Sequence, residues 1–446
     1  MSAIPRPIRH VATDLSHSAN SAGPVTSGRR ASNFQSNLSR ASFSPLNDSR
    51  ESAGKLHCMM ACRLASLRAL GLTGARVATP RISYPLFRRS FAVLSSPRAS
   101  SQPWDELSQP TGELQTTLSS SVSVSGVGLH LGLQTTVTLL PAAAGAGRVF
   151  HVVVPGDRGL VGIGADVRNV VDTRLSTVLG AAGVQESGVR VGTVEHLLSA
   201  LEGCGVDNCV IRVDGGGEMP LLDGSAAVWV RHIMAAGIEP ATVTVAGATA
   251  ERRRWNLPGK GPITVQHGDS FIAAFPRASP LLTYGIDFPH VPAIGRQWVS
   301  WDPARAQQQP QLDAAAEHEE QGEQPQECGD YMSGIAPART FCILEQVEQM
   351  RAAGLIKGGS LDNALVCSQT RGWVNPPLRV PFEPCRHKLL DLIGDLALCG
   401  RGGNSGIPNA HIVAYKASHA LHVAFGKALI DALEAEATDL AKGKDA

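Results

Sequence analysis

From about residue 115 to the C-terminus, strand-like and helix-like segments follow one another without regular alternation. Period-two or β-rich runs predict strands at 121–124, 135–140, 149–154, 209–213, 263–265, 271–275, 282–288, 364–367 and 411–416. Helical periodicity predicts helices at 193–202, 226–236, 344–353, 386–398 and 424–437. Regular β-α alternation would indicate a doubly wound sheet, whereas this irregular order favours an α+β fold. A boundary near 237–250 would leave each half with several strands and about two helices.

The first 100 residues have a different composition. They hold 18 Ser and 14 Lys or Arg, but only three acidic residues. This composition is typical of an organelle transit peptide, and residues 88–92 (Arg-Arg-Ser-Phe-Ala) resemble a mitochondrial processing site. We therefore predict a disordered transit peptide over 1–100 and a linker over 101–114. Mitochondrial targeting is favoured, with a plastid as the alternative; a tail without targeting function is the other interpretation.

Charge and cysteine content exclude several classes of protein. The whole chain has a net charge of +1, and beyond residue 100 it has 26 basic and 36 acidic residues, so nothing indicates nucleic-acid binding. No segment approaches the roughly 18 consecutive apolar residues of a membrane-spanning helix. Nine cysteines without a Cys-x-x-Cys pair exclude a disulfide scaffold and a four-cysteine zinc module, and they fit a reducing compartment.

Residues 306–327 interrupt the body of the chain. They include seven Gln and six acidic residues, with no Lys or Arg. A segment of this composition cannot bury a core, so we predict a disordered surface insertion.

The segment 192–201 predicts an apolar helix with two polar residues in its first turn. Apolar residues recur from Val194 at i, i+3, i+4 and i+7, while Glu195 and His196 begin the helix. An acid at this position is stabilised by the helix dipole. Taken alone, the pair is either a capping carboxylate beside a core histidine or part of a catalytic site.

The segment 386–396 places His387, Asp391 and Asp395 at i, i+4 and i+8, on one face of a helix. One interpretation is a surface ladder of His–Asp interactions. The other is a metal site, because a histidine and a carboxylate one turn apart can reach the same ion. A catalytic zinc takes three protein ligands of these types, and His196 is a candidate for the third.

Two further segments contain polar residues of possible chemical importance. His419 follows a predicted strand, where it can either be an ordinary surface histidine or act on substrate in a cleft. Thr340 is either structural or a hydroxyl donor to a developing oxyanion. The glycine runs at 215–217 and 358–359 lack the P-loop spacing, and the His-Glu-x-x-His signature is absent.

These segments occur in an order that is itself informative. Together they resemble the zinc-dependent UDP-3-O-acyl-N-acetylglucosamine deacetylase of bacterial lipid A biosynthesis, over about residues 115–435. The most specific part is the run Arg-His-Lys-x-x-Asp-x-x-Gly-Asp at 386–395. The segments that carry the resemblance are 126–130, 193–196, 205–208, 222–226, 338–341, 358–360, 386–395 and 418–421.

The resemblance implies a fold of two similar α+β domains, at 115–245 and 246–440, each with a β-sheet packed on a pair of helices. The helix layers of the two domains face each other. It also implies hydrolysis of the N-acetyl group of UDP-3-O-acyl-N-acetylglucosamine, giving UDP-3-O-acyl-glucosamine and acetate. We expect a monomer.

The resemblance also implies roles for individual residues. His196, His387 and Asp391 match the zinc ligands, although two imidazoles and a carboxylate also suit iron(II). Glu195 matches the general base that activates the attacking water. His419 matches the cationic acid, and Asp395 matches its carboxylate partner.

The remaining matched positions concern the substrate. Thr340 and Lys388 match groups that contact the acetyl oxygen and the substrate, and Lys416 matches a position associated with the nucleotide phosphates. Phe341 belongs to the substrate wall, and the helix beginning at Leu344 matches an insert that lines an acyl-chain passage. Ser176 and His422 depart from some bacterial relatives, and we expect His422 near the nucleotide.

Two alternatives stay open. The first is the same chemistry on another N-acetylated sugar nucleotide. The second is a non-catalytic lipid-binding or scaffold protein that has kept the fold. Glu195 and His419 argue against the second, because binding alone needs neither a base nor an acid.

Overall fold

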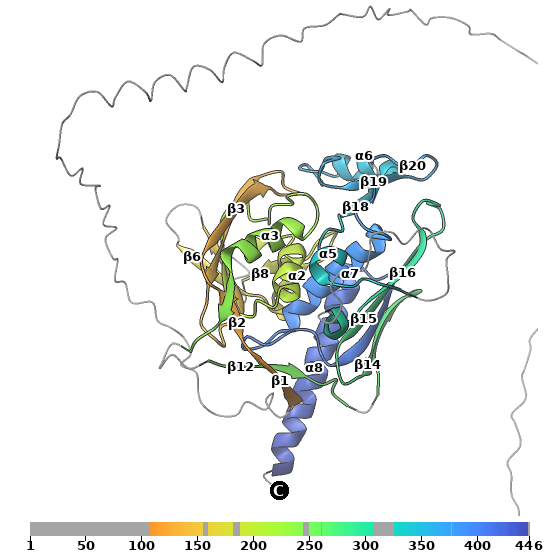
Figure 1. Cartoon of the computed structure of the whole chain (residues 1–446). Coiled ribbons are helices and arrows are strands. Elements are labelled where there is room, and N and C mark those ends of the chain that lie inside the picture. The colour runs from red at the N-terminus through yellow and green to blue at the C-terminus, as the bar shows by residue number, and fades with distance from the viewer. Residues whose placement is uncertain are drawn as a thin grey trace, which may run out of the picture. The chain divides into compact units, whose positions relative to one another are not determined.

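The computed structural model describes residues 107–154, 159–181, 188–243, 249–259, 261–306, 325–375 and 377–444. The predicted transit peptide lies outside these residues, and so does most of the predicted insertion. The described chain is a mixed structure of sheets and helices (Figure 1).

The first main sheet has five strands in the order β3-β4-β10-β5-β6. β10 lies at the centre, antiparallel to β4 and parallel to β5. Along β4, Thr135, Val137 and Leu139 are buried, and their neighbours in the strand are more exposed, as expected for a sheet covered on one face. The strands are β3 (Val122–Val127), β4 (Gln134–Pro141), β5 (Arg148–Val153), β6 (Leu160–Gly164) and β10 (Cys209–Gly215).

The second main sheet has six strands in the order β13-β14-β21-β15-β16-β17. β21 is antiparallel to β14 and parallel to β15. The strands are β13 (Ile263–His267), β14 (Ser270–Pro276), β15 (Leu281–Phe288), β16 (Gly295–Trp301), β17 (Gln326–Glu327) and β21 (Ala410–Tyr415).

The two sheets share one topology. In each, two hairpins flank a central strand that comes last in sequence, is antiparallel to one hairpin and is parallel to the other. One helix precedes each central strand and one follows it: α2 and α3 around β10, and α7 and α8 around β21. The second half therefore repeats the order of the first, with β17 as an added edge strand.

Helices α2 and α7 pack against each other between the two main sheets (Figure 1). The predicted apolar stripe of α2, which begins at Val194, is fully buried. The helices are α2 (Glu195–Gly203), α3 (Ala227–Ala236), α4 (Pro303–Ala306), α5 (Tyr331–Gly334), α6 (Leu344–Ala352), α7 (Glu383–Leu396) and α8 (His419–Lys444), with short 3-10 helices η1 (Val167–Asn169) and η2 (Ala397–Cys399). α8 begins five residues before the predicted start at 424.

Four small sheets complete the structure. One follows β6, and another carries α6 at the top of Figure 1. Their strands are β7 (Val170–Asp172), β8 (Val178–Gly180) and β9 (Arg190–Val191), then β18 (Phe341–Ile343), β19 (Leu365–Ser368) and β20 (Gly372–Trp373). Two further pairs join β1 (Ser108–Leu114) to β12 (Glu251–Trp255), and β2 (Thr116–Leu118) to β11 (Ile238–Pro240).

Two predicted boundaries are wrong. Part of the predicted linker 101–114 is strand β1, whose backbone pairs with β12 on the far side of the predicted domain boundary. The predicted insertion 306–327 ends too late, because Gln326 and Glu327 pair with β16 as strand β17. In both places backbone pairing with a distant strand orders a segment whose side chains give little strand signal.

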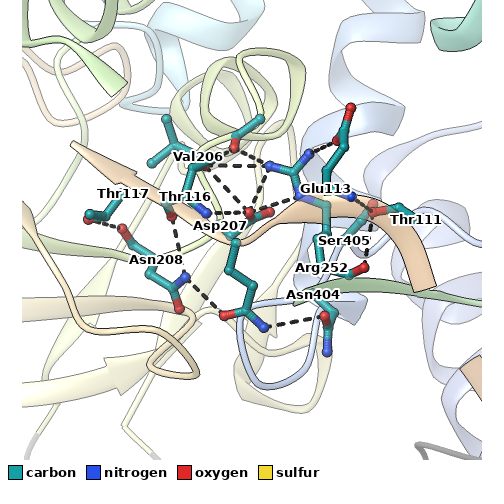
Figure 2. Close-up of polar contacts among 12 residues, drawn as sticks. Thr111, Glu113, Thr116, Thr117, Val206, Asp207, Asn208, Arg252, Asn404 and Ser405 are labelled. Carbon is teal, nitrogen blue, oxygen red and sulfur yellow. Dashed lines mark hydrogen bonds and ion pairs between the residues drawn. The ribbon is translucent and has the colours of Figure 1, made fainter. Parts of the chain in front are cut away.

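A network of hydrogen bonds and ion pairs, here called the polar joint, centres on Asp207 and Arg252 and links β1 and β12 to the loop before β10 (Figure 2). The Asp207 carboxylate accepts from the Thr116 backbone N–H at 2.8 Å and from the Arg252 guanidinium at 2.7 and 2.9 Å. Arg252 also contacts Glu113 at 2.6 Å and donates to the carbonyl of Gly205 at 2.6 Å. The Asp207 side chain is 3% exposed, so this ion pair is a buried one.

The seven cysteines in the described part of the chain are all free. No helix among the described residues is long and apolar enough to span a membrane.

Candidate active site

The site is assembled where α2, α7 and the start of α8 meet. Glu195 and His196 occupy the first turn of α2, His387, Asp391 and Asp395 lie along α7, and His419 begins α8. All six side chains are buried. The sequence placed the residues of α2 and α7 on helices and His419 ahead of one, and the packing of α2 on α7 brings the first five together.

Left-handed backbone occurs just before each of these helices. Thr193 (φ 57°), Phe382 (φ 51°) and Lys416 (φ 52°) precede α2, α7 and α8. Such conformations in non-glycine residues cost on the order of 1–3 kcal/mol each and tend to cluster at functional sites. Their position shows that the chain accepts local strain where it enters each helix of the site.

Three potential metal ligands converge. Nε2 of His196 lies 3.6 Å from Asp391 Oδ1, and Nε2 of His387 lies 3.4 Å from the same oxygen. The two imidazole rings meet edge to face with centroids 5.0 Å apart. One ligand atom from each residue lies within 4.8 Å of the others.

The protonation states of His387 and Asp391 make their facing atoms suitable ligands for a cation. Burial lowers the pKa of His387 to about 4, so the ring is neutral at pH 7. Its Nδ1–H donates to the Ala338 carbonyl at 3.0 Å, which leaves the lone pair of Nε2 facing Asp391 Oδ1. That oxygen is buried without a hydrogen-bond partner. A lone pair facing an unpartnered carboxylate oxygen is unfavourable unless a positive ion lies between them.

The other Asp391 oxygen is already satisfied. Lys388 contacts Oδ2 at 2.7 Å. Burial by itself raises the pKa of Asp391, but Lys388, His387 and His419 outweigh it and hold the pKa well below the ordinary value. Asp391 therefore offers one ionised oxygen, Oδ1, to an ion.

Glu195 lies beside this cluster. Its Oε2 accepts from the Thr177 backbone N–H at 3.0 Å, and its Oε1 lies 3.9 Å from His419 Nε2. Burial raises the pKa of Glu195, and the attraction of His419 and His196 opposes that rise without cancelling it. A raised pKa makes a carboxylate a better proton acceptor near neutral pH.

His419 and Asp395 form a tight pair. His419 Nδ1–H donates to Asp395 Oδ2 at 2.8 Å, and Thr177 Oγ1 donates to Asp395 Oδ1 at 2.6 Å. Burial lowers the pKa of His419, but three carboxylates, led by Asp395, outweigh it and raise the pKa to about 9. His419 is therefore an imidazolium at pH 7 and can act as an acid.

His422 is buried beside Asp395. We expected it near the nucleotide; it is 1% exposed and donates from Nδ1 to Asp395 Oδ2 at 2.8 Å. Its Nε2 lies 3.1 Å from the Tyr284 hydroxyl. Asp395, His419 and His422 have the spacing of a second metal group, but their facing atoms already hydrogen-bond to one another.

The predicted substrate residues differ in how close they lie to the buried cluster. Lys388 lies in the site through its contact with Asp391. Thr340 and Phe341 follow Ala338, whose carbonyl binds His387, and Phe341 packs edge-on against Phe288 at 5.6 Å. Leu344 begins α6 and is half-buried.

Lys416 is the exception among these residues. Its ammonium pairs with Asp269 at the surface instead of turning towards the cluster. A role at the nucleotide phosphates would need this pair to open.

Three residues near the centre were not singled out by sequence reasoning. Thr177 holds both Glu195 and Asp395, and Tyr284 contacts His422. The third is His130, whose two ring nitrogens are buried without a hydrogen-bond partner. Burial lowers the pKa of His130, and repulsion from His419 lowers it further. Only His130 had a signal, since it closes the Gly-x-Gly-x-His run at 126–130.

Comparison with known proteins identifies the family. Residues 115–431 match the model of the LpxC family, described as UDP-3-O-acyl N-acetylglycosamine deacetylase. The chain belongs to the LpxC family. The match covers the described body of the chain almost completely, including every element that supplies the site.

Individual LpxC-family relatives agree with this assignment. One from Arabidopsis thaliana, named "Probable UDP-3-O-acyl-N-acetylglucosamine deacetylase 1, mitochondrial", is 47% identical over 319 residues, or 70% of this chain and 87% of its own. Relatives named UDP-3-O-acyl-N-acetylglucosamine deacetylase from Trichormus variabilis and Synechocystis are 45% and 43% identical. Each covers 71% of this chain and 98% of its own length.

Proposed function

We propose that this chain hydrolyses the N-acetyl group of UDP-3-O-acyl-N-acetylglucosamine, an early committed step of lipid A biosynthesis. The products are UDP-3-O-acyl-glucosamine and acetate. The observation that carries the proposal is the buried convergence of three potential metal ligands with Glu195 and His419. The names of relatives 43–47% identical to the chain support the same substrate.

We propose zinc as the metal, held by His196, His387 and Asp391. Two imidazoles and one carboxylate with an open fourth position are typical of catalytic zinc. When bound, zinc polarises a carbonyl and lowers the pKa of a coordinated water to about 7. The unpartnered Asp391 Oδ1 supports this assignment.

Glu195 is the proposed base. Thr177 holds its Oε2, so Oε1 is the oxygen free to take a proton from the attacking water. Burial raises the pKa of this carboxylate, which makes it a better proton acceptor. The carboxyl group then holds that proton while the amide carbon becomes tetrahedral.

His419 is the proposed acid. An amide nitrogen leaves well only when it is protonated, and the His419 imidazolium can deliver that proton from Nε2. Asp395 fixes the ring through Nδ1 and stabilises its charged form. The C–N bond breaks, the amine leaves with the proton, and acetate carries the added oxygen.

We assign the remaining residues to substrate binding. Lys388 and Thr340 would contact the acetyl oxygen, and the Lys416 ammonium would contact the nucleotide phosphates once released from Asp269. Phe341 and Leu344 would line the path of the acyl chain. No residue of α6 is fully buried, which leaves this helix free to make a further contact.

We further propose that the two halves are two similar domains, supported by their shared strand order and helix positions. Residues 1–100 would act as a transit peptide, and the mitochondrial names of the Arabidopsis relatives favour the mitochondrion over the plastid. We propose a monomer as the functional unit.

The test is acetate release by the full-length chain from UDP-3-O-acyl-N-acetylglucosamine. Assays with a chelator, with added zinc and with added iron(II) identify the metal, and UDP-N-acetylglucosamine without the acyl chain is the control substrate. We expect chelator-sensitive turnover of the acylated substrate only. Equal turnover of both substrates would instead indicate a broader sugar-nucleotide deacetylase. No turnover with metal bound would favour a non-catalytic role.

A further inference from the structure

One carboxylate oxygen in the site accepts two imidazole N–H groups. Asp395 Oδ2 lies 2.8 Å from His419 Nδ1 and 2.8 Å from His422 Nδ1. Its other oxygen, Oδ1, accepts from Thr177 Oγ1 at 2.6 Å. The Asp395 side chain is fully buried, so these three donors replace water around a buried charge.

The donor on His422 follows from its partners. Attraction to His419 and His422 outweighs burial and lowers the pKa of Asp395 to about 2, so the carboxylate can only accept hydrogen bonds. Nδ1 of His422 must therefore carry a hydrogen. The Tyr284 hydroxyl donates to the Ala417 carbonyl at 2.7 Å and lies 3.1 Å from His422 Nε2, so Tyr284 packs against the far edge of the ring.

His422 cannot act on substrate directly. Its side chain is fully enclosed, and the Tyr284 side chain behind it is fully buried as well. It lies one helical turn after His419 on α8 and shares Asp395 Oδ2 with it. It reaches the reaction through its neighbours: the carboxylate that it shares with His419, and the His419 ring itself, whose centroid lies 5.7 Å from its own.

We propose that His422 is a positioning residue for the deacetylation. Its Nδ1–H fixes Asp395 in the orientation that holds His419 with Nε2 towards Glu195 and Asp391, at 3.9 and 3.8 Å. Without that bond one acceptor site of a buried carboxylate is empty, and Asp395 is held by Thr177 and His419 alone. This inference rests on the function proposed above.

Isosteric variants separate the two bonds of His422. The side-chain amide of Asn reaches about as far as Nδ1, so His422→Asn can donate to Asp395 but cannot reach Tyr284. The amide of Gln reaches about as far as Nε2, so His422→Gln keeps the Tyr284 contact and loses the Asp395 bond. His422→Leu removes both. Val423→Ala, a buried apolar truncation at the next position of α8, is the matched control.

The experiment measures kcat, KM and bound metal for each full-length protein with the acylated substrate, below its thermal unfolding range. A hydrogen bond to a charged group corresponds to a loss of about 10- to 100-fold when it is removed. We expect His422→Gln and His422→Leu to lose kcat by about this factor at unchanged KM and metal content. His422→Asn should restore most of the kcat that His422→Leu loses, and Val423→Ala should keep the wild-type value.

Several outcomes would overturn the proposal. If His422→Gln and His422→Asn lose kcat equally, or all three variants keep it, the Asp395 bond does not position His419. If losses follow the melting temperature instead of donor position, His422 has only a structural role. A wild-type protein without turnover overturns the proposed function, and the positioning role with it.

Discussion

Gly394 of α7 packs directly against the main chain of Glu195 of α2. A Cβ atom on Gly394 would lie 2.0 Å from the Glu195 carbonyl oxygen and 3.0 Å from the Glu195 α-carbon. No side chain can occupy that space, so only glycine allows the two helices to approach this closely. The approach is what brings His196 of α2 within 3.6 Å of Asp391 on α7.

Gly394→Ala tests this spacing. Alanine is the better helix former by about 1 kcal/mol, so in isolation the change would stabilise α7. We expect the opposite, a loss of about 1–3 kcal/mol in the free energy of unfolding, because the helices must move apart. A displacement of about 1 Å at a catalytic group costs on the order of 10²-fold in rate, so kcat/KM should fall by about that factor. Denaturant unfolding and acetate release measure both effects.

Gly261→Ala is the matched control. A Cβ atom there meets nothing within 4 Å, and the residue is exposed. This variant should keep wild-type stability and activity. An unchanged Gly394→Ala variant would show that α2 and α7 can separate without disturbing the site.

Glu195 and His387 should respond differently to substitution. Glu195→Gln removes the proposed base but none of the proposed ligands, so metal should remain bound while kcat falls by about 10²–10⁴-fold. His387→Ala removes a ligand, so both metal and activity should be lost. Metal analysis of the purified proteins beside acetate release separates the two results. Full metal content in His387→Ala would refute the ligand assignment, and normal turnover in Glu195→Gln would refute the base.

Sequence periodicity predicted α2 and α7, which carry most of this site, but it started α8 after His419. The stripe from Val194 and the i, i+4, i+8 spacing from His387 placed the potential ligands on the correct faces of α2 and α7. Those signals are local, because a helix face is set by residues a few positions apart. Periodicity did not show that α2 meets α7, since that contact depends on Gly394 and on a core shared by residues almost 200 positions apart.

The residues and the strand that sequence patterns did not reveal share a physical cause. Thr177 lies in a short irregular segment beside β8. It binds Glu195 through its backbone N–H and Asp395 through its hydroxyl, and neither contact leaves a periodic pattern in the sequence. Tyr284 lies in a buried strand, where an aromatic residue is expected for packing alone. β1 contains Pro110 and Gly112 and is mostly exposed, so its pairing with β12 leaves no apolar alternation to detect.

Arg252→Met should destabilise the polar joint of Figure 2. It leaves the Asp207 carboxylate buried without its charged partner, and breaking such a pair costs about 3–5 kcal/mol. Arg212→Met is the control, because the Arg212–Asp214 pair is solvent-exposed and should contribute about 0–1 kcal/mol. Denaturant unfolding of both variants measures the difference, and equal losses would mean that the joint is no more important than a surface pair.

Asp395→Asn should change the pH dependence of turnover in a definite direction. The proposed reaction needs Glu195 ionised to accept a proton and His419 protonated to donate one. The plot of kcat/KM against pH should therefore be bell-shaped. The acidic limb lies above pH 4.5, since burial raises the pKa of Glu195 from that value. The alkaline limb reports the loss of the His419 proton, and nearby carboxylates outweigh burial to raise that pKa to about 9. Removing the charge of Asp395 removes the largest of these attractions.

The alkaline limb of Asp395→Asn should therefore move to lower pH, with a lower maximum because the ring is also held less firmly. The same change affects stability: a raised His419 pKa stabilises the fold below pH about 6.5, and this contribution is lost as pH rises through about 9. In the variant this contribution should be smaller, and its loss should be complete at lower pH. Asp214→Asn, on the surface of β10, should leave both profiles unchanged. An alkaline limb that stays in place, at equal metal content, would mean that His419 is not the acid, because no other change in charge distinguishes the two proteins.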